Sequence, residues 1–225
     1  MDPQATYDRI ASHFSKTREY AWPEVASFIE GRDVGEDDAV DGVGDMGDVR
    51  VALDVGCGNG RHTELLADVA DCAVGVDVSR GLLSEARHRA GDRGYAEPTE
   101  FVHGDAARLP VADDAVDLAV YVATLHHLRP QSQRVASLSE LARALRPGAV
   151  ALVSAWSTAH DTFDREEGFD TTVDWTLPGG ETVPRYYHIY APDEFDADIR
   201  ESDLELVDAG VSSGNCYAVV RAPMA

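Results

Sequence analysis

Short apolar runs alternate with helical segments between residues 51 and 155, and this alternation constrains the fold more than any other feature of the sequence. Five runs have the composition of buried strands, at residues 51–55, 73–77, 101–105, 116–121 and 149–155. Helical periodicity separates them, at residues 61–70, 79–90 and 131–146, and Pro147-Gly148 is expected to end the last helix. Strands that alternate with helices form βαβ units, so the pattern predicts an α/β fold with a parallel sheet and helices on both faces.

The last part of the chain departs from this alternation. Residues 206–211 and 216–221 are two further strands, joined only by Ser212-Ser213-Gly214-Asn215. Since this connection is too short for a helix, the two strands must be antiparallel. Residues 1–225 are therefore predicted to form one domain, with a seven-stranded, mostly parallel sheet that ends in an antiparallel hairpin.

Three segments lie outside the sheet pattern. Residues 7–30 have helical periodicity, and Pro23 is placed to open a second helix. Residues 31–50 are rich in glycine and aspartate and predict an acidic surface loop. Residues 156–185 are polar, contain the turn Pro178-Gly179-Gly180, and predict an insertion near the substrate site.

The chain is strongly acidic, with a formal net charge of −22 and a single lysine, Lys16. This composition is typical of an extreme halophile, and we expect a halophilic archaeon, although a basic partner would also explain it. In molar salt the Debye length falls to about 3 Å, so the acidic charge does not exclude a nucleic-acid substrate. The sequence has neither a long apolar run nor a signal-peptide pattern, which predicts a cytoplasmic protein without membrane contact.

The three cysteines, Cys57, Cys72 and Cys216, are far apart and form no CxxC pair. The sequence therefore predicts neither a disulfide framework nor a metal site. The adjacent histidines His126 and His127 have no carboxylate or cysteine partner at ligand spacing.

The glycine-rich turn Gly56-Cys57-Gly58-Asn59-Gly60 follows the first strand and precedes a helix. Glycines let the backbone approach a ligand closely, and a helix N-terminus offers free N–H groups to a carboxylate. Asp77 ends the second strand, where a carboxylate can accept from both ribose hydroxyls, and Asp105 ends the third, where it can accept from an adenine amino group. An NAD-linked oxidoreductase uses a similar turn, but no Tyr-x-x-x-Lys pair is recognisable.

Taken in order, the turn, Asp77 and Asp105 resemble motifs I, II and III of the class I S-adenosylmethionine (SAM)-dependent methyltransferases. The resemblance implies a Rossmann-like fold with SAM as the cofactor. The cofactor contacts it implies are Tyr7, Gly56, Cys57, Gly58, Asn59, Gly60, Asp77, Val78, Asp105, Ala106 and Val122.

Further motifs resemble a narrower family. They are the run His13-Phe14-Ser15-Lys16-Thr17-Arg18, the pair His126-His127, the run Arg185-Tyr186-Tyr187-His188, and Asn215-Cys216-Tyr217. Together they resemble the tRNA wobble-uridine carboxymethyl methyltransferases, over the chain from Tyr7 to Val220 apart from residues 31–50. Two runs depart from that family: Glu19-Tyr20-Ala21-Trp22-Pro23 replaces a Lys-Pro-Trp-Pro run, and Asn215-Cys216-Tyr217 replaces Asn-Trp-Tyr.

This resemblance implies that the carboxylate of 5-carboxymethyluridine at tRNA position 34 is esterified. A carboxylate is ionised at neutral pH and needs no general base, so cations and hydrogen-bond donors are expected at the site. The implied catalytic residues are Arg18, His126, Arg185 and Asn215, and the implied substrate-binding residues are His13, His127, Tyr186 and Tyr187. Simpler roles stay open, with Arg185 in a surface ion pair and Asn215 as a turn residue.

The implied partners are the tRNA anticodon loop and a small zinc-binding activator subunit. The activator is expected to form a heterodimer at the sheet edge near Phe101 and Val102. Two other functions remain open: a methyltransferase acting on a quinone precursor or other metabolite, and a SAM-binding partner protein without catalysis.

Overall fold

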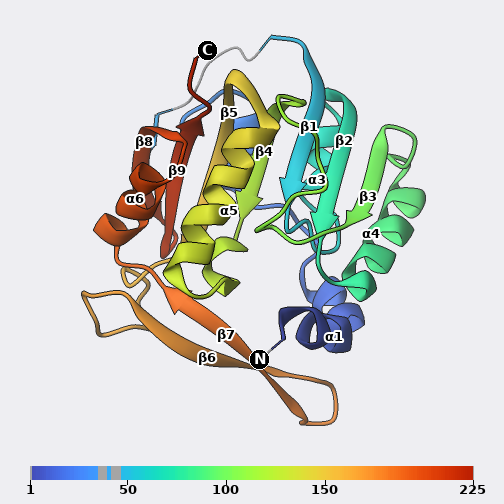
Figure 1. Cartoon of the computed structure of the whole chain (residues 1–225). Helices are drawn as coiled ribbons and strands as arrows, with labels where there is room; N and C mark the ends of the chain where they lie inside the picture. The colour runs from blue at the N-terminus through green and yellow to red at the C-terminus, as the bar shows by residue number, and fades with distance from the viewer. Residues whose placement is uncertain (1, 35–39, 42–46, 225) are drawn as a thin grey trace.

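The computed structural model describes residues 2–34, 40–41 and 47–224 and contains a seven-stranded sheet in the order β3-β2-β1-β4-β5-β9-β8 (Figure 1). Its strands are β1 Val49–Val55, β2 Ala70–Asp77, β3 Thr99–His103, β4 Val116–Val122, β5 Leu145–Trp156, β8 Glu205–Ser212 and β9 Asn215–Arg221. The strands β1 to β5 are parallel, and β9 is antiparallel to both β5 and β8. The predicted fold class, including the terminal hairpin, is therefore confirmed.

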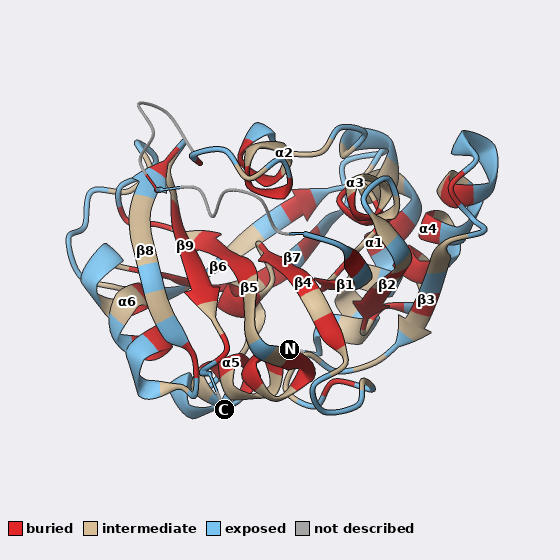
Figure 2. Ribbon diagram, turned by 90° about the horizontal axis from the view of Figure 1, so that it is seen from above, coloured by how far each residue is buried: buried red, intermediate tan, exposed pale blue. Residues whose placement is uncertain are grey.

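Helices cover both faces of this sheet (Figure 2). The helices α5 Gln131–Ala144 and α6 Pro192–Glu201 share a core with one face, while α2 Pro23–Ile29, α3 Thr63–Ala67 and α4 Arg80–Arg93 pack on the other. The central strand β4 is buried on both sides, which explains why its sequence is a continuous apolar run rather than an alternating one. No helix in the described part of the chain has the length and apolar character needed to span a membrane.

The carboxyl ends of the parallel strands meet at one edge, and two further elements cover it (Figure 1). These are the N-terminal helix α1 Pro3–Thr17 and a two-stranded antiparallel hairpin, β6 Phe169–Thr176 and β7 Thr182–Ile189. Ile10 of α1 packs against Trp175 and Val183 of the hairpin. The insertion predicted at residues 156–185 thus extends to Ile189 and forms part of a cover over the sheet edge.

Several predicted boundaries are wrong. The helix predicted over residues 131–146 ends at Ala144, because Leu145 already pairs with Val116, and Pro147-Gly148 lie inside β5. The helix predicted over residues 61–70 is reduced to α3, and Val69, which lies beyond its end, is 44% exposed. The third strand ends at His103, so Asp105 lies in the loop that follows.

Two segments differ more fundamentally from the prediction. Helix α6 was not predicted, although Pro192 at its start and the buried pair Phe195 and Ile199 are helix signals. The loop predicted over residues 31–50 contains a bridge between Val34 and Val40, and both side chains are buried. The predicted loop also ends too late, because Val49 and Arg50 already belong to β1, and residues 35–39 and 42–46 lie outside the described residues.

Candidate active site

A cavity of about 410 Å³ lies at the carboxyl edge of the sheet, between the glycine-rich turn, α1 and β7. All the predicted cofactor residues except Gly60 line it: Tyr7, Gly56, Cys57, Gly58, Asn59, Asp77, Val78, Asp105, Ala106 and Val122. Gly60 has a positive φ and lies against Tyr95, Phe101 and Ala86, where a Cβ would come within 3.1–3.3 Å of them. Its role is therefore to allow close packing behind the turn.

The glycine-rich turn is held in place by the neighbouring strand β2. The amides of Gly56 and Cys57 donate to the carbonyl of Val76 at 2.7 and 3.0 Å. Gly56 has a φ of 72°, and a Cβ there would overlap the side chain of Thr124. Gly58 is also left-handed, but a Cβ there would meet only Phe14, at 3.8 Å, so its backbone is open to a ligand.

Asp77 supports the turn as well as facing the cavity. Its two carboxylate oxygens accept hydrogen bonds from the amides of Gly58, at 2.8 Å, and Ser79, at 2.7 Å. Burial raises the pKa of Asp77 to about 6, and those two hydrogen bonds oppose the rise. An ionised carboxylate has about four acceptor positions, so two remain for hydrogen bonds from a ligand such as the ribose expected there.

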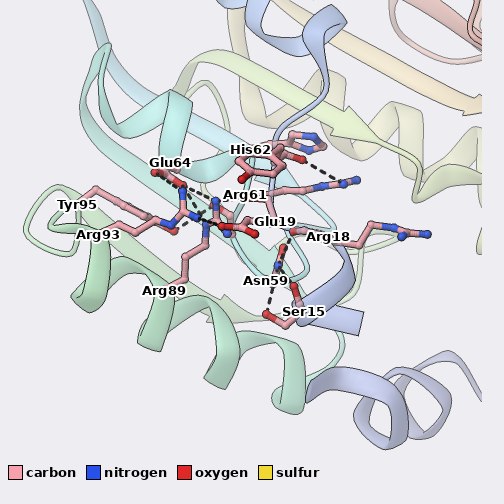
Figure 3. A network of polar contacts seen from close by, with 12 residues as sticks. Ser15, Arg18, Glu19, Asn59, Arg61, His62, Glu64, Arg89, Arg93 and Tyr95 are labelled. Atoms are coloured by element: carbon pink, nitrogen blue, oxygen red, sulfur yellow. Dashed lines mark hydrogen bonds and ion pairs between the residues drawn. The ribbon is translucent and has the colours of Figure 1, made fainter. Parts of the chain in front are cut away.

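Asn59 has a role that the sequence did not reveal. Its side chain is almost fully buried and donates to the carbonyl of Arg18 at 2.9 Å and to the hydroxyl of Ser15 at 3.3 Å (Figure 3). Nearer the middle of α1, the side chain of Asp8 accepts from the Ser79 hydroxyl and the Gly81 amide at 2.7 and 2.8 Å. Helix α1 is thus attached both to the glycine-rich turn and to the start of α4.

Arg185 is the main charged group on the opposite wall of the cavity. Its side chain is buried, and its guanidinium donates to the Tyr187 hydroxyl at 2.6 Å and lies 4.9 Å from the Trp175 ring. It forms no ion pair with a carboxylate in the described ranges, and its Nε atom has no hydrogen-bond partner there. A buried positive charge without a counter-ion is costly, so this wall is complementary to an anionic ligand.

The structure separates the roles of the two adjacent histidines. His127 lines the cavity, and its Nδ1 lies 2.9 Å from the carbonyl of Tyr186, which only accepts. The proton is therefore on Nδ1, and Nε2 accepts from the Tyr7 hydroxyl at 2.9 Å. Burial lowers the pKa of His127 to about 4, so this ring is neutral at physiological pH.

His126 faces away from the cavity. Its Nδ1 accepts from the amide of Trp156 at 3.0 Å, and its ring packs against Tyr187 with centroids 4.8 Å apart. Burial lowers its pKa well below the ordinary value, with His127 adding to the effect. The structure thus gives His126 a place in the packing behind Arg185.

The remaining predicted residues differ in how close the structure brings them to the cavity. Tyr186 lies on strand β7 of the hairpin and lines the cavity. Its hydroxyl donates to Asp170 at 2.8 Å. His13, Arg18 and Tyr187 do not line the cavity but contact residues that do or the hairpin beside it. Asn215 is not brought to the cavity; its side chain donates to the carbonyl of Ser213 at 3.1 Å across the β8–β9 turn.

Several residues that line the cavity were not predicted. They include Arg61, His62, Leu82, Thr124, Leu128, Arg129 and Gln133. Only Arg61 and His62 have an obvious signal, because they directly follow the glycine-rich turn. Leu82 comes from α4, while Thr124, Leu128 and Arg129 follow β4 and Gln133 lies in α5.

Comparisons with known proteins agree with this geometry. Residues 53–153 match the family described as methyltransferase domain. A predicted methyltransferase of Encephalitozoon cuniculi is 30% identical, and the match covers 96% of this chain and 92% of that protein. The tRNA (carboxymethyluridine(34)-5-O)-methyltransferase of Saccharomyces cerevisiae is 30% identical over 80% of this chain, which spans only 58% of that enzyme's length.

Solved structures share the fold at lower sequence identity. The CcbJ methyltransferase from Streptomyces caelestis superposes with a TM-score of 0.75 and 21% identity, over 99% of this chain and 100% of that one. A methyltransferase in complex with the Haloferax volcanii Trm112 methyltransferase activator gives a TM-score of 0.69 and 16% identity, over 100% and 99%.

The fold and the cavity define a class I methyltransferase, the class whose methyl donor is S-adenosylmethionine. The chain belongs to the methyltransferase family. The residues present fit this cofactor, since the open backbone of Gly58 and the carboxylate of Asp77 lie on the same wall of the cavity. Bound SAM supplies a methyl group on a positively charged sulfur.

Proposed function

We propose that this protein methylates the carboxylate of 5-carboxymethyluridine at the wobble position of tRNA, in the cytoplasm. The observation that carries the proposal is Arg185, a buried guanidinium that faces the cofactor cavity with no carboxylate partner in the part of the chain described here. Relatives that bear the name of this activity, such as the yeast enzyme, support the choice of substrate.

The wall around Arg185 suits the chemistry of ester formation. A guanidinium that binds one oxygen of the substrate carboxylate leaves the second oxygen to attack the methyl carbon, with cleavage of the sulfur–methyl bond. The products are a methyl ester and S-adenosylhomocysteine, and no proton is transferred. His127 agrees with this, because its pKa of about 4 makes it a weak base and its Nε2 already accepts from the Tyr7 hydroxyl.

We also infer that a small zinc-binding activator pairs with the protein at strand β3. This strand lies at the edge of the sheet, so one side of its backbone has no neighbouring strand in the described ranges. The structural neighbour that is complexed with the Trm112 activator supports this inference. Co-purification of the two chains tests it, and an activator that neither binds nor increases SAM affinity would refute it.

A labelling experiment tests the proposed reaction. The protein, alone and with its activator, is incubated with methyl-labelled SAM and bulk tRNA, followed by nucleoside analysis of position 34. Label in an alkali-labile ester at that position is the expected result. Label only in a metabolite extract would refute the proposal in favour of a small-molecule substrate, and SAM binding without any transfer would favour a non-catalytic partner protein.

A further inference from the structure

The connection between α1 and α2 holds an exposed aromatic side chain on a well-anchored backbone. Tyr20 is 75% exposed and is the only aromatic residue among the exposed large hydrophobic side chains of the described ranges. A single exposed ring is common on protein surfaces, so the case for this site depends on the contacts around Tyr20 and on the neighbouring charges.

The backbone on both sides of Tyr20 is fixed by four hydrogen bonds. The carbonyls of residues 18, 19 and 20 accept from Asn59 at 2.9 Å, Arg89 at 2.7 Å and Arg61 at 3.4 Å. The amide of Trp22 donates to His62 at 3.4 Å. The ring of Tyr20 is therefore presented by a rigid segment, and binding a ligand there costs little conformational entropy.

Arg61 connects this segment to the cavity. It lines the cavity, lies 5.2 Å from the ring of Trp22, and forms no ion pair with a carboxylate within the described ranges. Arg18, on the same side of the network in Figure 3, also lacks such an ion pair within those ranges. Carboxylates outnumber lysine and arginine by 41 to 19 in this chain, so two neighbouring arginines without a carboxylate partner in its described part are unexpected.

The charges around Arg61 favour an anion beside it. Burial lowers the pKa of Arg61 to about 10, and repulsion from Arg18 adds to the effect, while attraction to the buried carboxylate of Asp54 opposes it. Asp54 accepts a hydrogen bond from the Thr63 hydroxyl at 2.6 Å and forms no ion pair with Arg61. The nearest acidic side chain of the segment, Glu19, is paired with Arg93 at 3.2 Å on the other side of the network (Figure 3). A phosphate next to Arg61 would thus meet two guanidinium groups and a carboxylate that is already paired.

We propose that Tyr20 and Arg61 form a nucleotide subsite beside the methylation site. In it, a base next to the target uridine stacks on Tyr20, and the adjoining phosphate binds Arg61. Single-stranded RNA is recognised in this way, by aromatic stacking together with backbone contacts from cations. This inference rests on the proposed function, because it requires an RNA loop as the substrate.

The test is binding of an anticodon stem-loop RNA, measured by fluorescence anisotropy at several salt concentrations. Tyr20→Ala should weaken binding about tenfold, and Tyr20→Phe should restore it, since stacking needs only the ring. Arg61→Gln should reduce the slope of log K against log salt by about 0.7, the value for one phosphate contact to a single strand. Arg200→Gln, an exposed arginine of α6, is the matched control and should leave the slope unchanged.

Two further measurements separate this inference from the proposed function. SAM affinity should be unchanged in Tyr20→Ala, and the free 5-carboxymethyluridine nucleoside, which has no neighbouring base, should be methylated as by the unmodified protein. A stem-loop that is methylated normally and bound equally well by Tyr20→Ala would overturn the subsite and leave the proposed function intact. Loss of SAM affinity in Arg61→Gln without a change in salt slope would assign Arg61 to the cofactor and also overturn it.

Discussion

Replacing Arg185 by methionine should make the protein more stable and inactive at the same time. Arg185 is 8% exposed, and in the described ranges its charge is balanced by no carboxylate. Methionine fills a similar volume without the cost of burying a charge. The substitution removes the hydrogen bond to Tyr187 and the stacking of the guanidinium over the rings of Trp175 and Tyr187.

The substitution should raise the free energy of unfolding and lower kcat/KM, and the two changes have different physical causes. Removal of the cation–ring interactions costs about 0.5–2 kcal/mol, and relief of an unpaired buried charge is worth several kcal/mol before relaxation. We expect a net gain of about 1 kcal/mol in the free energy of unfolding, or about 2–4 °C in Tm. Loss of two charge-assisted hydrogen bonds to a carboxylate, at about 1.5–3 kcal/mol each, should lower kcat/KM by at least about a hundredfold.

Arg134 provides the matched control, because it is equally buried but paired. Its guanidinium lies 3.3 Å from Asp198 and 3.5 Å from Glu194. Arg134→Met should therefore destabilise the protein by about 3–5 kcal/mol, since a buried carboxylate loses its partner. Differential scanning calorimetry gives the stabilities, and SAM titration confirms that the cofactor wall is intact. An Arg185→Met variant that is less stable than the unmodified protein, or that keeps kcat/KM within about tenfold, would refute the reasoning.

Four further predictions concern the rest of the site and the surface. Lowering the pH through about 6 should weaken SAM binding, because Asp77 becomes protonated and loses acceptor capacity; Asp77→Asn should bind SAM about 1.5–3 kcal/mol more weakly by calorimetric titration, without that pH dependence. Between about pH 7 and pH 9, kcat should be flat, because the substrate is already a carboxylate and His127, with a pKa of about 4, stays neutral. Asn59→Ala should raise hydrogen exchange at residues 15–20 and lower the free energy of unfolding by about 1–3 kcal/mol, because buried carbonyls lose their donor. Raising KCl from about 0.1 to 2 M should raise Tm if the charge of −22 is an adaptation to concentrated salt.

Each of these predictions has an outcome that contradicts it. SAM affinity that is constant from pH 8 to pH 5 would remove Asp77 from the ribose site. If kcat instead rises with pH near pH 7, and this rise disappears in His127→Phe, the His127 ring acts as a base. Exchange at residues 15–20 that is unaffected by Asn59→Ala would show that α1 is held by other contacts, such as those of Asp8. A Tm that falls with salt would point to a basic partner instead of a saline habitat.

The strands themselves and the glycine-rich turn were predictable because their signals are local. The apolar run of β4 and the short connection before β9, which the structure reduces to Ser213-Gly214, each define a strand or a turn within a few positions. Helix α6 was missed because it is short and only Phe195, Asp198 and Ile199 are buried. The early start of β5 could not be predicted, since Leu145 leaves the helix in order to pair with Val116, which lies 29 positions earlier in the sequence.

The sequence by itself determined the cofactor half of the site. A cofactor site of this kind needs glycines with positive φ, a helix N-terminus and a carboxylate at a strand end. Each of these features is indicated by one short stretch of sequence. Asp77 could be proposed in this way because it ends a strand signalled by its own short apolar run; its contact to Gly58, 19 positions earlier, was not visible in the sequence.

Only the tertiary structure decided the substrate half. The proton position of His127 depends on Tyr7 and Tyr186, which are 120 and 59 positions away along the chain. In the same way, Arg185 is proposed as a site for an anion only because the folded chain buries it among rings and brings no described carboxylate to it. The type of a residue limits the roles that its side chain can have. Its burial and the partners that the fold brings to it determine which of these roles it takes.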